Sequence, residues 1–230
     1  VEMCLPVQPR CSAPGRVSCM NEDWLERWQI GRIGWHEAEG NKSLRRHWGA
    51  SARRVLVPLC GKSQDLLWLA HEGNQVVGVE LSEIAAEALF DENELAYSRV
   101  DGEMPVYAGD DGRITIYCGD YFEFSLSDDV AAFDAYYDRG ALVAVAPDIR
   151  EAYVRHSRSL LAADAVKLII SVEYDQAVAK GPPFSIPAEA MRALWPELER
   201  VDAYDDMDNC PPKFREAGLD AIVEAVWRSP

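Results

Sequence analysis

A short turn with one glycine is the part of this sequence best suited to hold a ligand. The stretch RVLVPL, residues 54–59, is almost wholly apolar, as is typical of a strand buried on both faces of a parallel sheet, and the helical pattern SQDLLWLAHEG follows it closely. In open α/β sheets, ligands bind beyond the carboxyl ends of the strands, where helix N-termini offer unpaired N–H groups. The turn at Gly61 therefore marks a candidate binding site.

The ligand at this turn is expected to lack a pyrophosphate. Dinucleotides need close backbone approach at several points, hence G-x-G-x-x-G, whereas PLCGKSQD contains a single glycine. Glu80 ends the next strand pattern nineteen positions after Gly61, where a carboxylate can accept hydrogen bonds from both hydroxyls of a ribose. S-adenosylmethionine fits both features, because it is a nucleoside whose amino-acid carboxylate can rest on the N–H groups of the turn. The same residues also fit a plain βα turn and a surface strand end.

These residues need a sheet to position them, and the chain alternates accordingly. Helices are predicted at 21–29, 41–48, 63–73, 82–93 and 148–162, and strands at 54–59, 74–81, 112–120, 133–140 and 165–174. Such alternation predicts a doubly wound α/β sheet. Two last strands, 199–206 and 219–227, are separated by a loop that is too short for a helical crossover, so we expect them to pair antiparallel.

Composition argues against several classes of function. A chain of 230 residues with 48% hydrophobic content can form one large domain, and its net charge of −16 makes nucleic acid an unfavourable partner. No apolar run approaches the roughly 18 to 20 residues that a membrane span needs. We therefore expect a protein of the cytoplasm that is monomeric, binds small molecules and has no membrane partner.

The six cysteines are scattered and include no C-x-x-C pair, which favours reduced thiols and no metal site. Three of them precede Met20, in a stretch with neither an apolar period nor the apolar centre of a signal peptide. We expect residues 1–19 to be an extension that is disordered or non-native, and 20–230 to form a single domain. A docking arm is the alternative for the extension.

Four segments resemble the thiopurine S-methyltransferase family, and its bacterial branch in particular. They are DWLERWQIGRIGWHE, VPLCGKSQDLLWLAHEGNQVVGVELS, YYDRGALVAVAPDIREAY and SVEYDQAVAKGPPFSIP, and the similarity runs from Asn21 to Trp227. The resemblance implies an α/β fold of the class I methyltransferase type: a Rossmann-like, mostly parallel sheet of seven strands with helices on both faces and a C-terminal antiparallel hairpin. It also implies S-adenosyl-L-methionine as the methyl donor and S-adenosyl-L-homocysteine as a product.

The resemblance further implies roles for individual residues. The cofactor is expected to contact Trp24, Trp28, Leu59, Gly61, Glu80 and Arg139, with Asp120 and Tyr121 at the adenine. The substrate pocket is expected to be formed by Arg139, Pro182, Pro183 and Phe184. The family also has a basic residue near the last hairpin that approaches the substrate, and here both Lys213 and Arg215 qualify.

Methyl transfer from a sulfonium to a thiolate is an in-line displacement, which needs alignment rather than a metal or a covalent intermediate. A guanidinium favours the thiolate and orients it, which is the catalytic role expected of Arg139, and Asp138 either shares that role or holds Arg139. The expected activity is S-methylation of aromatic or heterocyclic thiols, thiopurines included, and it extends to selenium and tellurium species. A thiol, thiocyanate or halide methyltransferase and a non-catalytic nucleoside-binding protein are the alternatives.

Structural roles compete with several of these assignments. Trp24 and Trp28 lie four residues apart and share a helix face, so they fit a packing stripe as well as a cofactor lid. Asp138 and Arg139 also fit an ion pair at a strand end. His36 is expected at the surface, and Cys60 is expected to be a small turn residue because no histidine is paired with it.

Overall fold

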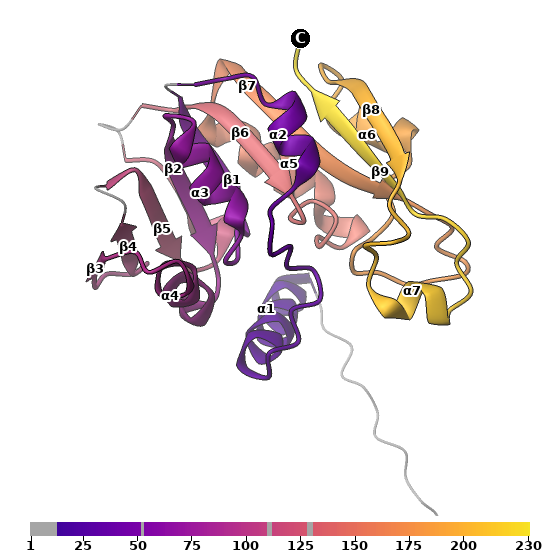
Figure 1. The fold of residues 1–230 in the computed structure, drawn as a ribbon, viewed down its shortest axis with the longest axis horizontal. Helices are drawn as coiled ribbons and strands as arrows, with labels where there is room; N and C mark the ends of the chain where they lie inside the picture. Colours follow the sequence, from indigo (N-terminus) through magenta and orange to yellow (C-terminus); the bar gives the residue numbers. More distant parts are fainter. Residues whose placement is uncertain (1–12, 52, 110–111, 128–130) are drawn as a thin grey trace, which may run out of the picture.

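One twisted sheet organises the computed structural model, which describes residues 13–51, 53–109, 112–127 and 131–230 (Figure 1). Its strands are β1 (Arg54–Pro58), β2 (Gln75–Glu80), β3 (Tyr97–Val100), β4 (Val106–Gly109), β5 (Ile114–Cys118), β6 (Phe133–Arg139), β7 (Leu161–Glu173), β8 (Glu199–Asp205) and β9 (Val223–Arg228). They lie in the order β3-β4-β5-β2-β1-β6-β7-β9-β8. The five adjacent strands β5, β2, β1, β6 and β7 are parallel to one another, whereas β9 is antiparallel to both β7 and β8.

Helices cover both faces of this sheet. The α-helices are α1 (Ala13–Gln29), α2 (Lys42–His47), α3 (Gln64–His71), α4 (Glu83–Glu92), α5 (Arg150–Leu160), α6 (Ala188–Leu194) and α7 (Pro212–Glu216), and η2 (Tyr121–Glu123) and η3 (Pro147–Ile149) are single 3-10 turns. The expected class I methyltransferase fold, with its antiparallel pair at the C-terminus, is confirmed.

The sheet has nine strands rather than seven because β3 and β4 extend it beyond β5. Both are antiparallel and only four residues long, and three of the four residues of β3 are exposed. So short a strand with so little buried surface carries no clear alternation of apolar and polar residues, which is why sequence pattern misses it. Tyr97 of β3 nevertheless packs on Phe90 of α4, with ring centroids 5.0 Å apart.

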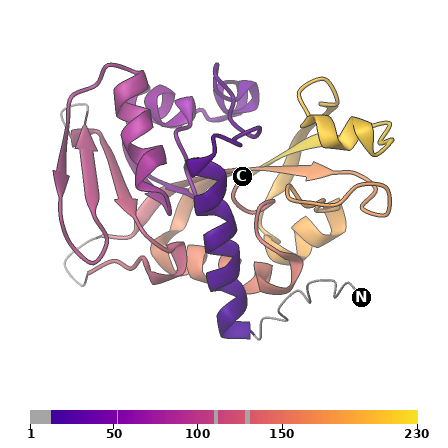
Figure 2. The same cartoon turned by 90° about the horizontal axis from the view of Figure 1, so that it is seen from below.

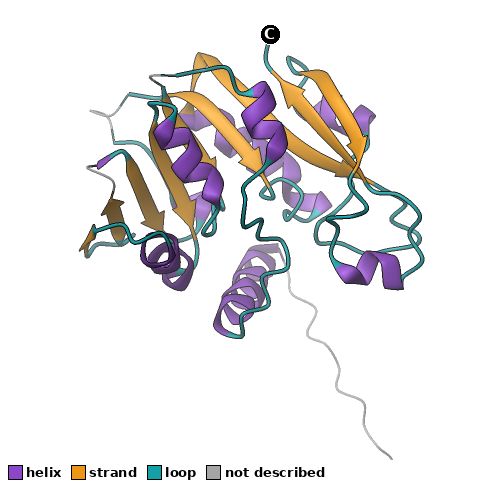
Figure 3. Cartoon of the chain, in the orientation of Figure 1, coloured by secondary structure: helices purple, strands orange, loops and turns teal. Residues whose placement is uncertain are grey.

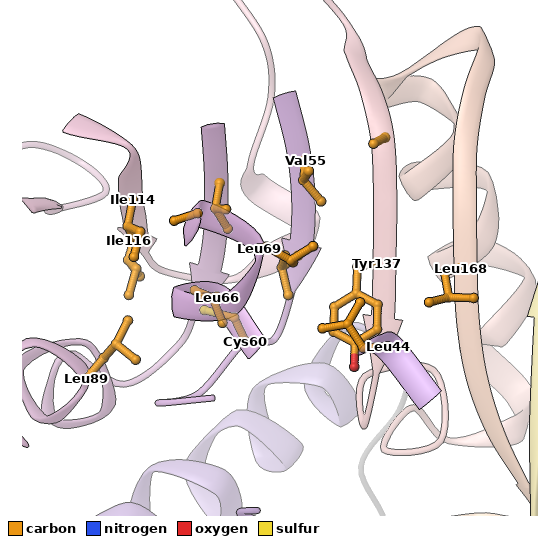
Figure 4. Close-up of a cluster of buried hydrophobic side chains, with 14 of the residues drawn as sticks. Leu44, Val55, Cys60, Leu66, Leu69, Leu89, Ile114, Ile116, Tyr137 and Leu168 are labelled. Carbon is orange, nitrogen blue, oxygen red and sulfur yellow. The ribbon is translucent and has the colours of Figure 1, made fainter. Parts of the chain in front are cut away.

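The apolar sequences of β1 and β2 follow from burial on both faces. On one face α2, α3 and α4 pack against the sheet, and Figure 4 shows Leu66 and Leu69 of α3 in the same buried cluster as Val55. On the other face α5 and α6 pack through Tyr153 and Met191. At roughly 1.5 to 3 kcal/mol for each fully buried large apolar side chain, these two layers hold the parallel strands in place.

Helix α1 begins at Ala13, so the domain boundary expected at Met20 falls inside a helix. Residues 1–12, the first part of the expected extension, lie outside the described residues. Within the described residues, no helix combines the length and the hydropathy that a bilayer crossing requires. Helix α7 occupies the loop between β8 and β9, yet the two strands pair antiparallel as expected.

Candidate active site

A cavity of about 490 Å³ opens at the carboxyl ends of the parallel strands. Helix α1 crosses the same edge of the sheet, as Figure 2 shows from below, and Figure 3 shows loops at this edge. The residues expected from sequence that line this cavity are Trp24, Trp28, Leu59, Gly61, Glu80, Asp120, Tyr121, Arg139, Pro182, Pro183 and Lys213. Most of the site expected from the sequence therefore comes together in one place.

The turn after β1 has an unusual backbone. Leu59 and Gly61 have φ angles of 45° and 53°, in the left-handed region that only glycine adopts without cost. A Cβ built on Gly61 would lie 3.2 Å from Cζ2 of Trp28, so this indole closely covers the turn. Ser63 then caps α3 by accepting a hydrogen bond from the backbone N–H of Asp65. The turn thus presents backbone to the cavity underneath a tryptophan.

Glu80 lies buried at the end of β2 and fastens this turn. Its Oε2 accepts a hydrogen bond of 2.8 Å from the N–H of Gly61, and its Oε1 accepts one of 2.9 Å from the N–H of Ser82. Burial raises the pKa of Glu80, although these backbone N–H groups oppose the rise. Each carboxylate oxygen can accept a second hydrogen bond, so the two oxygens of Glu80 can together still accept hydrogen bonds from two ribose hydroxyls.

Asp120 joins the end of β5 to helix α1. Its Oδ1 caps η2 by accepting a hydrogen bond of 2.9 Å from the N–H of Phe122, and its Oδ2 accepts one of 2.8 Å from Nδ2 of Asn21. Asn21 also lines the cavity and is not among the residues expected from sequence. Its amide is a direct polar link between α1 and the strand end at which the adenine is expected.

A third tryptophan completes the aromatic cover of the cavity. Trp35 packs edge-on against Trp24 and Trp28, with ring centroids 5.0 and 5.9 Å away. All three tryptophans line the cavity. Trp24 and Trp28 of α1 therefore form part of the cavity wall and are not only a packing stripe on the helix. His36, which is expected at the surface, is half-buried and lines the cavity as well, and burial and the charge of Lys62 lower its pKa.

Arg139 lies at the end of β6 and is held by the loop that follows α1. Its Nη1 donates to the carbonyl of Trp35 at 2.8 Å, and its Nη2 forms an ion pair with Glu37. Burial disfavours the charge of Arg139, but the surrounding carboxylates, Glu37 above all, outweigh burial and raise its pKa. Burial also raises the pKa of Glu37, against the effect of Arg139. Arg139 is therefore a fixed cation at the cavity wall.

Asp138 does not hold Arg139, and it is not among the residues that line the cavity. Neighbouring residues of a strand point to opposite faces, and the fully buried Asp138 accepts hydrogen bonds from the N–H of Leu142 and the hydroxyls of Tyr136 and Tyr153 at 2.7 to 3.0 Å. The alternative of an ion pair between Asp138 and Arg139 is not found, because Asp138 makes these contacts on one face of the sheet and Arg139 pairs with Glu37 on the other.

Phe184 also lies outside the cavity wall formed by Pro182 and Pro183. Its ring packs tightly against Gly181, where an added Cβ would lie 2.3 Å from Cδ1 of Phe184. The guanidinium of Arg150 lies 5.9 Å from the centroid of the same ring. Phe184 thus supports the loop of the pocket from behind.

The structure separates the two basic residues of the last hairpin. Lys213 lines the cavity and donates to the carbonyls of Lys180 and Pro182, and burial lowers its pKa. Arg215 is not among the lining residues and donates to the carbonyl of Met207 instead. Lys213 is therefore the residue of the two that can approach a molecule in the cavity.

Cys60 and the acidic loop between β8 and β9 have no catalytic arrangement. Burial raises the pKa of the Cys60 thiol well above its ordinary value, so the thiol stays protonated, and its sulfur packs against Gly78. Over the described ranges, no three histidine, cysteine or acidic side chains converge in a way that could hold a metal ion, the loop residues Asp205, Asp206 and Asp208 included.

Comparison with known proteins agrees with this site. Residues 19–229 match the model of the family described as thiopurine S-methyltransferase. The chain is 41% identical over 213 residues to the thiopurine S-methyltransferase of Pseudomonas syringae pv. syringae, covering 89% of this chain and 94% of that protein. It is 39% identical over 212 residues to the thiopurine S-methyltransferase of Nitrosospira multiformis, and the match covers 90% of this chain and 96% of that protein.

The fold has counterparts among solved structures. One is the 1,6-didemethyltoxoflavin-N1-methyltransferase of Burkholderia thailandensis, whose crystal structure contains 1,6-didemethyltoxoflavin and S-adenosylhomocysteine. It superposes with a TM-score of 0.62 at 21% identity, covering 97% of this chain and 93% of that one. At this level of identity the likeness concerns the fold alone.

Proposed function

The chain belongs to the thiopurine S-methyltransferase family, and on that basis we propose that it methylates the sulfur of aromatic or heterocyclic thiols, thiopurines among them, with S-adenosylmethionine as the donor. Membership confirms the family and the enzyme class expected from the sequence. One observation carries the proposal for this chain. The same cavity is lined by Glu80 at the end of β2, by Asp120 just after β5 and by the fixed cation Arg139 at the end of β6.

The cofactor half of the cavity suits an adenosyl group with an amino-acid tail. The carboxylate of Glu80 keeps acceptor capacity for two ribose hydroxyls after its bonds to Gly61 and Ser82. Asp120 and Tyr121 would flank the adenine, and the turn at Gly61 would receive the carboxylate of the tail. When bound, the cofactor supplies a methyl group on a positively charged sulfur.

The acceptor half provides alignment and charge. The transfer forms a bond from the acceptor sulfur to the methyl carbon and breaks the bond from that carbon to the sulfonium, so the three atoms must be collinear. Arg139 stabilises the thiolate form of the acceptor, because a guanidinium favours a neighbouring anion. Ile170 and Val172 extend the wall beyond Arg139 as an apolar surface. Such a surface suits an aromatic ring better than a thiocyanate or halide ion.

We also propose that the enzyme acts in the cytoplasm as a single-domain monomer, with small molecules rather than nucleic acid as partners. The net charge of −16 supports the part of this proposal that concerns nucleic acid, since a negative protein repels polyanions. Selenium and tellurium species are proposed as further acceptors because, like thiolates, they are soft nucleophiles.

The test is transfer of a labelled methyl group from S-adenosylmethionine to 6-mercaptopurine and to thiophenol. The wild-type protein should label both sulfurs, and Arg139→Gln should lower kcat/KM at least about tenfold, as expected for loss of a charge-assisted contact. Arg215→Gln is the matched control, because it removes a guanidinium that does not line the cavity. Wild-type protein that labels neither thiol, or an Arg139→Gln variant as active as wild type, would overturn the proposal.

A further inference from the structure

Glu224 of β9 is a buried carboxylate that the proposed reaction does not use. We propose that Glu224 determines acceptor specificity by accepting, at its Oε2, a hydrogen bond from a ring N–H of the substrate. The preferred substrates would then be heterocyclic thiols that carry such an N–H. This inference rests on the proposed function, which by itself places no requirement on the far end of the acceptor.

The two oxygens of Glu224 have different surroundings. Oε1 accepts hydrogen bonds from Oγ of Ser43 at 3.1 Å, from Nδ2 of Asn41 at 3.4 Å and from the hydroxyl of Tyr204. Oε2 accepts no hydrogen bond from the described part of the chain. Glu224 is only 5% exposed and yet lines the cavity, so Oε2 is the oxygen available to a bound molecule.

The sheet places Glu224 opposite Arg139 across an apolar floor. Arg139 of β6 pairs with Ile170 of β7, and Val172 of β7 pairs with Glu224 of β9, so all four residues share one face of the sheet. Neighbouring strands lie about 4.8 Å apart, which puts the backbones of β6 and β9 about 10 Å from each other. A flat heterocycle can therefore lie on Ile170 and Val172 with its sulfur toward Arg139 and its other end toward Glu224.

A hydrogen-bond donor is the partner that this carboxylate requires. An ionised carboxylate has only acceptor positions, and leaving one of its oxygens unpaired inside a complex costs affinity. The three donors on Oε1 come from α2, from the residue that caps it and from β8, so the side chain is held in one orientation. A thiol with a purely hydrocarbon ring would cover Oε2 without satisfying it and should bind less well.

Glu224→Gln isolates this contact. The three donors would retain the amide oxygen at the position of Oε1, so the NH2 group would occupy the position of Oε2 and face the cavity as a donor. The variant should therefore keep its fold and lose its preference for acceptors with a ring N–H. Glu173→Gln is the matched control, because Glu173 lies next to Val172 on β7, pairs with Arg200 and is not among the lining residues.

The experiment compares 6-mercaptopurine with thiophenol, which has no ring N–H. Both are titrated calorimetrically into the complex of the protein with S-adenosylhomocysteine, and both are then assayed as methyl acceptors. Glu224→Gln should lower the preference for 6-mercaptopurine about tenfold in Kd and in kcat/KM, whereas Glu173→Gln should leave it unchanged. Thermal unfolding checks that each variant is folded.

Failure of the proposed function and failure of the role of Glu224 give different results in this experiment. Wild-type protein that binds 6-mercaptopurine selectively but labels no thiol would contradict the proposed function and leave the role of Glu224 supported by binding. Wild-type protein without selectivity between the two thiols, or a folded Glu224→Gln variant that retains the selectivity within about twofold, would overturn the role of Glu224 alone.

Discussion

Replacement of Glu80 by glutamine should weaken cofactor binding sharply while nearly preserving the volume of the side chain. In the wild-type protein each carboxylate oxygen accepts one backbone N–H, from Gly61 and from Ser82. A glutamine offers only one oxygen, so in either orientation its NH2 group faces a backbone N–H. The ribose would likewise lose one of its two acceptors.

The size of both effects can be estimated from hydrogen-bond energies. Losing one charge-assisted bond to the ribose costs about 1.5 to 3 kcal/mol, or a Kd for S-adenosylhomocysteine that is about 10 to 150 times higher. The buried, unpaired N–H should lower the free energy of unfolding by about 1 to 3 kcal/mol. Removing a buried charge offsets part of that loss, because burial already disfavours the ionised form of Glu80.

The pH dependence of binding provides a second readout with a definite sign. Because burial raises the pKa of Glu80 in the folded protein, its proton stabilises the fold, and this contribution is lost as pH rises through the raised pKa. Cofactor affinity changes in the opposite direction, since the ribose hydroxyls need the carboxylate. Affinity for S-adenosylhomocysteine should therefore fall as pH decreases through the raised pKa of Glu80 in wild type, and this component should be absent in Glu80→Gln.

Calorimetric titration of S-adenosylhomocysteine, combined with urea unfolding, measures both quantities. Glu83→Gln is the matched control: Glu83 lies three residues further on, pairs with Arg99 and is not among the lining residues. A folded Glu80→Gln variant that binds within about twofold of wild type, or that keeps the wild-type pH dependence, would refute the assignment of Glu80 to the ribose.

Three further substitutions test the surroundings of the cavity. Asp138→Asn should lower the free energy of unfolding in urea by about 2 to 4 kcal/mol because it leaves a buried donor unpaired, and an unchanged midpoint would contradict that structural role. Asn21→Ala removes the bond to Asp120, so S-adenosylhomocysteine should dissociate about 2 to 12 times faster in stopped-flow fluorescence at nearly constant stability; an equal rate would show that this link does not close the cavity. Gly61→Ala should cost about 1 to 2 kcal/mol of stability from its φ of 53° and also weaken binding by displacing Trp28, whereas Gly73→Ala, at a φ of 85° with open space around its Cβ, should affect stability only.

Sequence pattern was sufficient for the parallel centre of the fold. The run of apolar residues in β1, the helical spacing in α3 and the acidic end of β2 are local signals, so the turn at Gly61 and the position of Glu80 could be predicted together. The resemblance to a family added Arg139 and the proline loop. The period of a strand is by itself enough to predict that Asp138 and Arg139 point to opposite faces of the sheet.

Other parts of the site had only weak signals. Trp35 and Glu37 lie in a loop without periodic pattern, and Asn21 is one polar residue among several in α1. The sequence around the last hairpin offered both Lys213 and Arg215, and only the path of the chain brings Lys213 to the cavity. The short strands β3 and β4 could not be predicted because each has only four residues, and three of the four in β3 are exposed.

What this sequence determined by itself is therefore the kind of fold, the turn at Gly61 and the acidic residue Glu80 beyond it. Only the tertiary structure decided that Arg139 pairs with Glu37, 102 residues away, and that Ser43 holds one oxygen of Glu224, 181 residues away. Periodicity reports which face of an element is buried, because burial acts on each residue separately. Partners between distant elements depend on strand order and register, which arise from the packing of the whole chain.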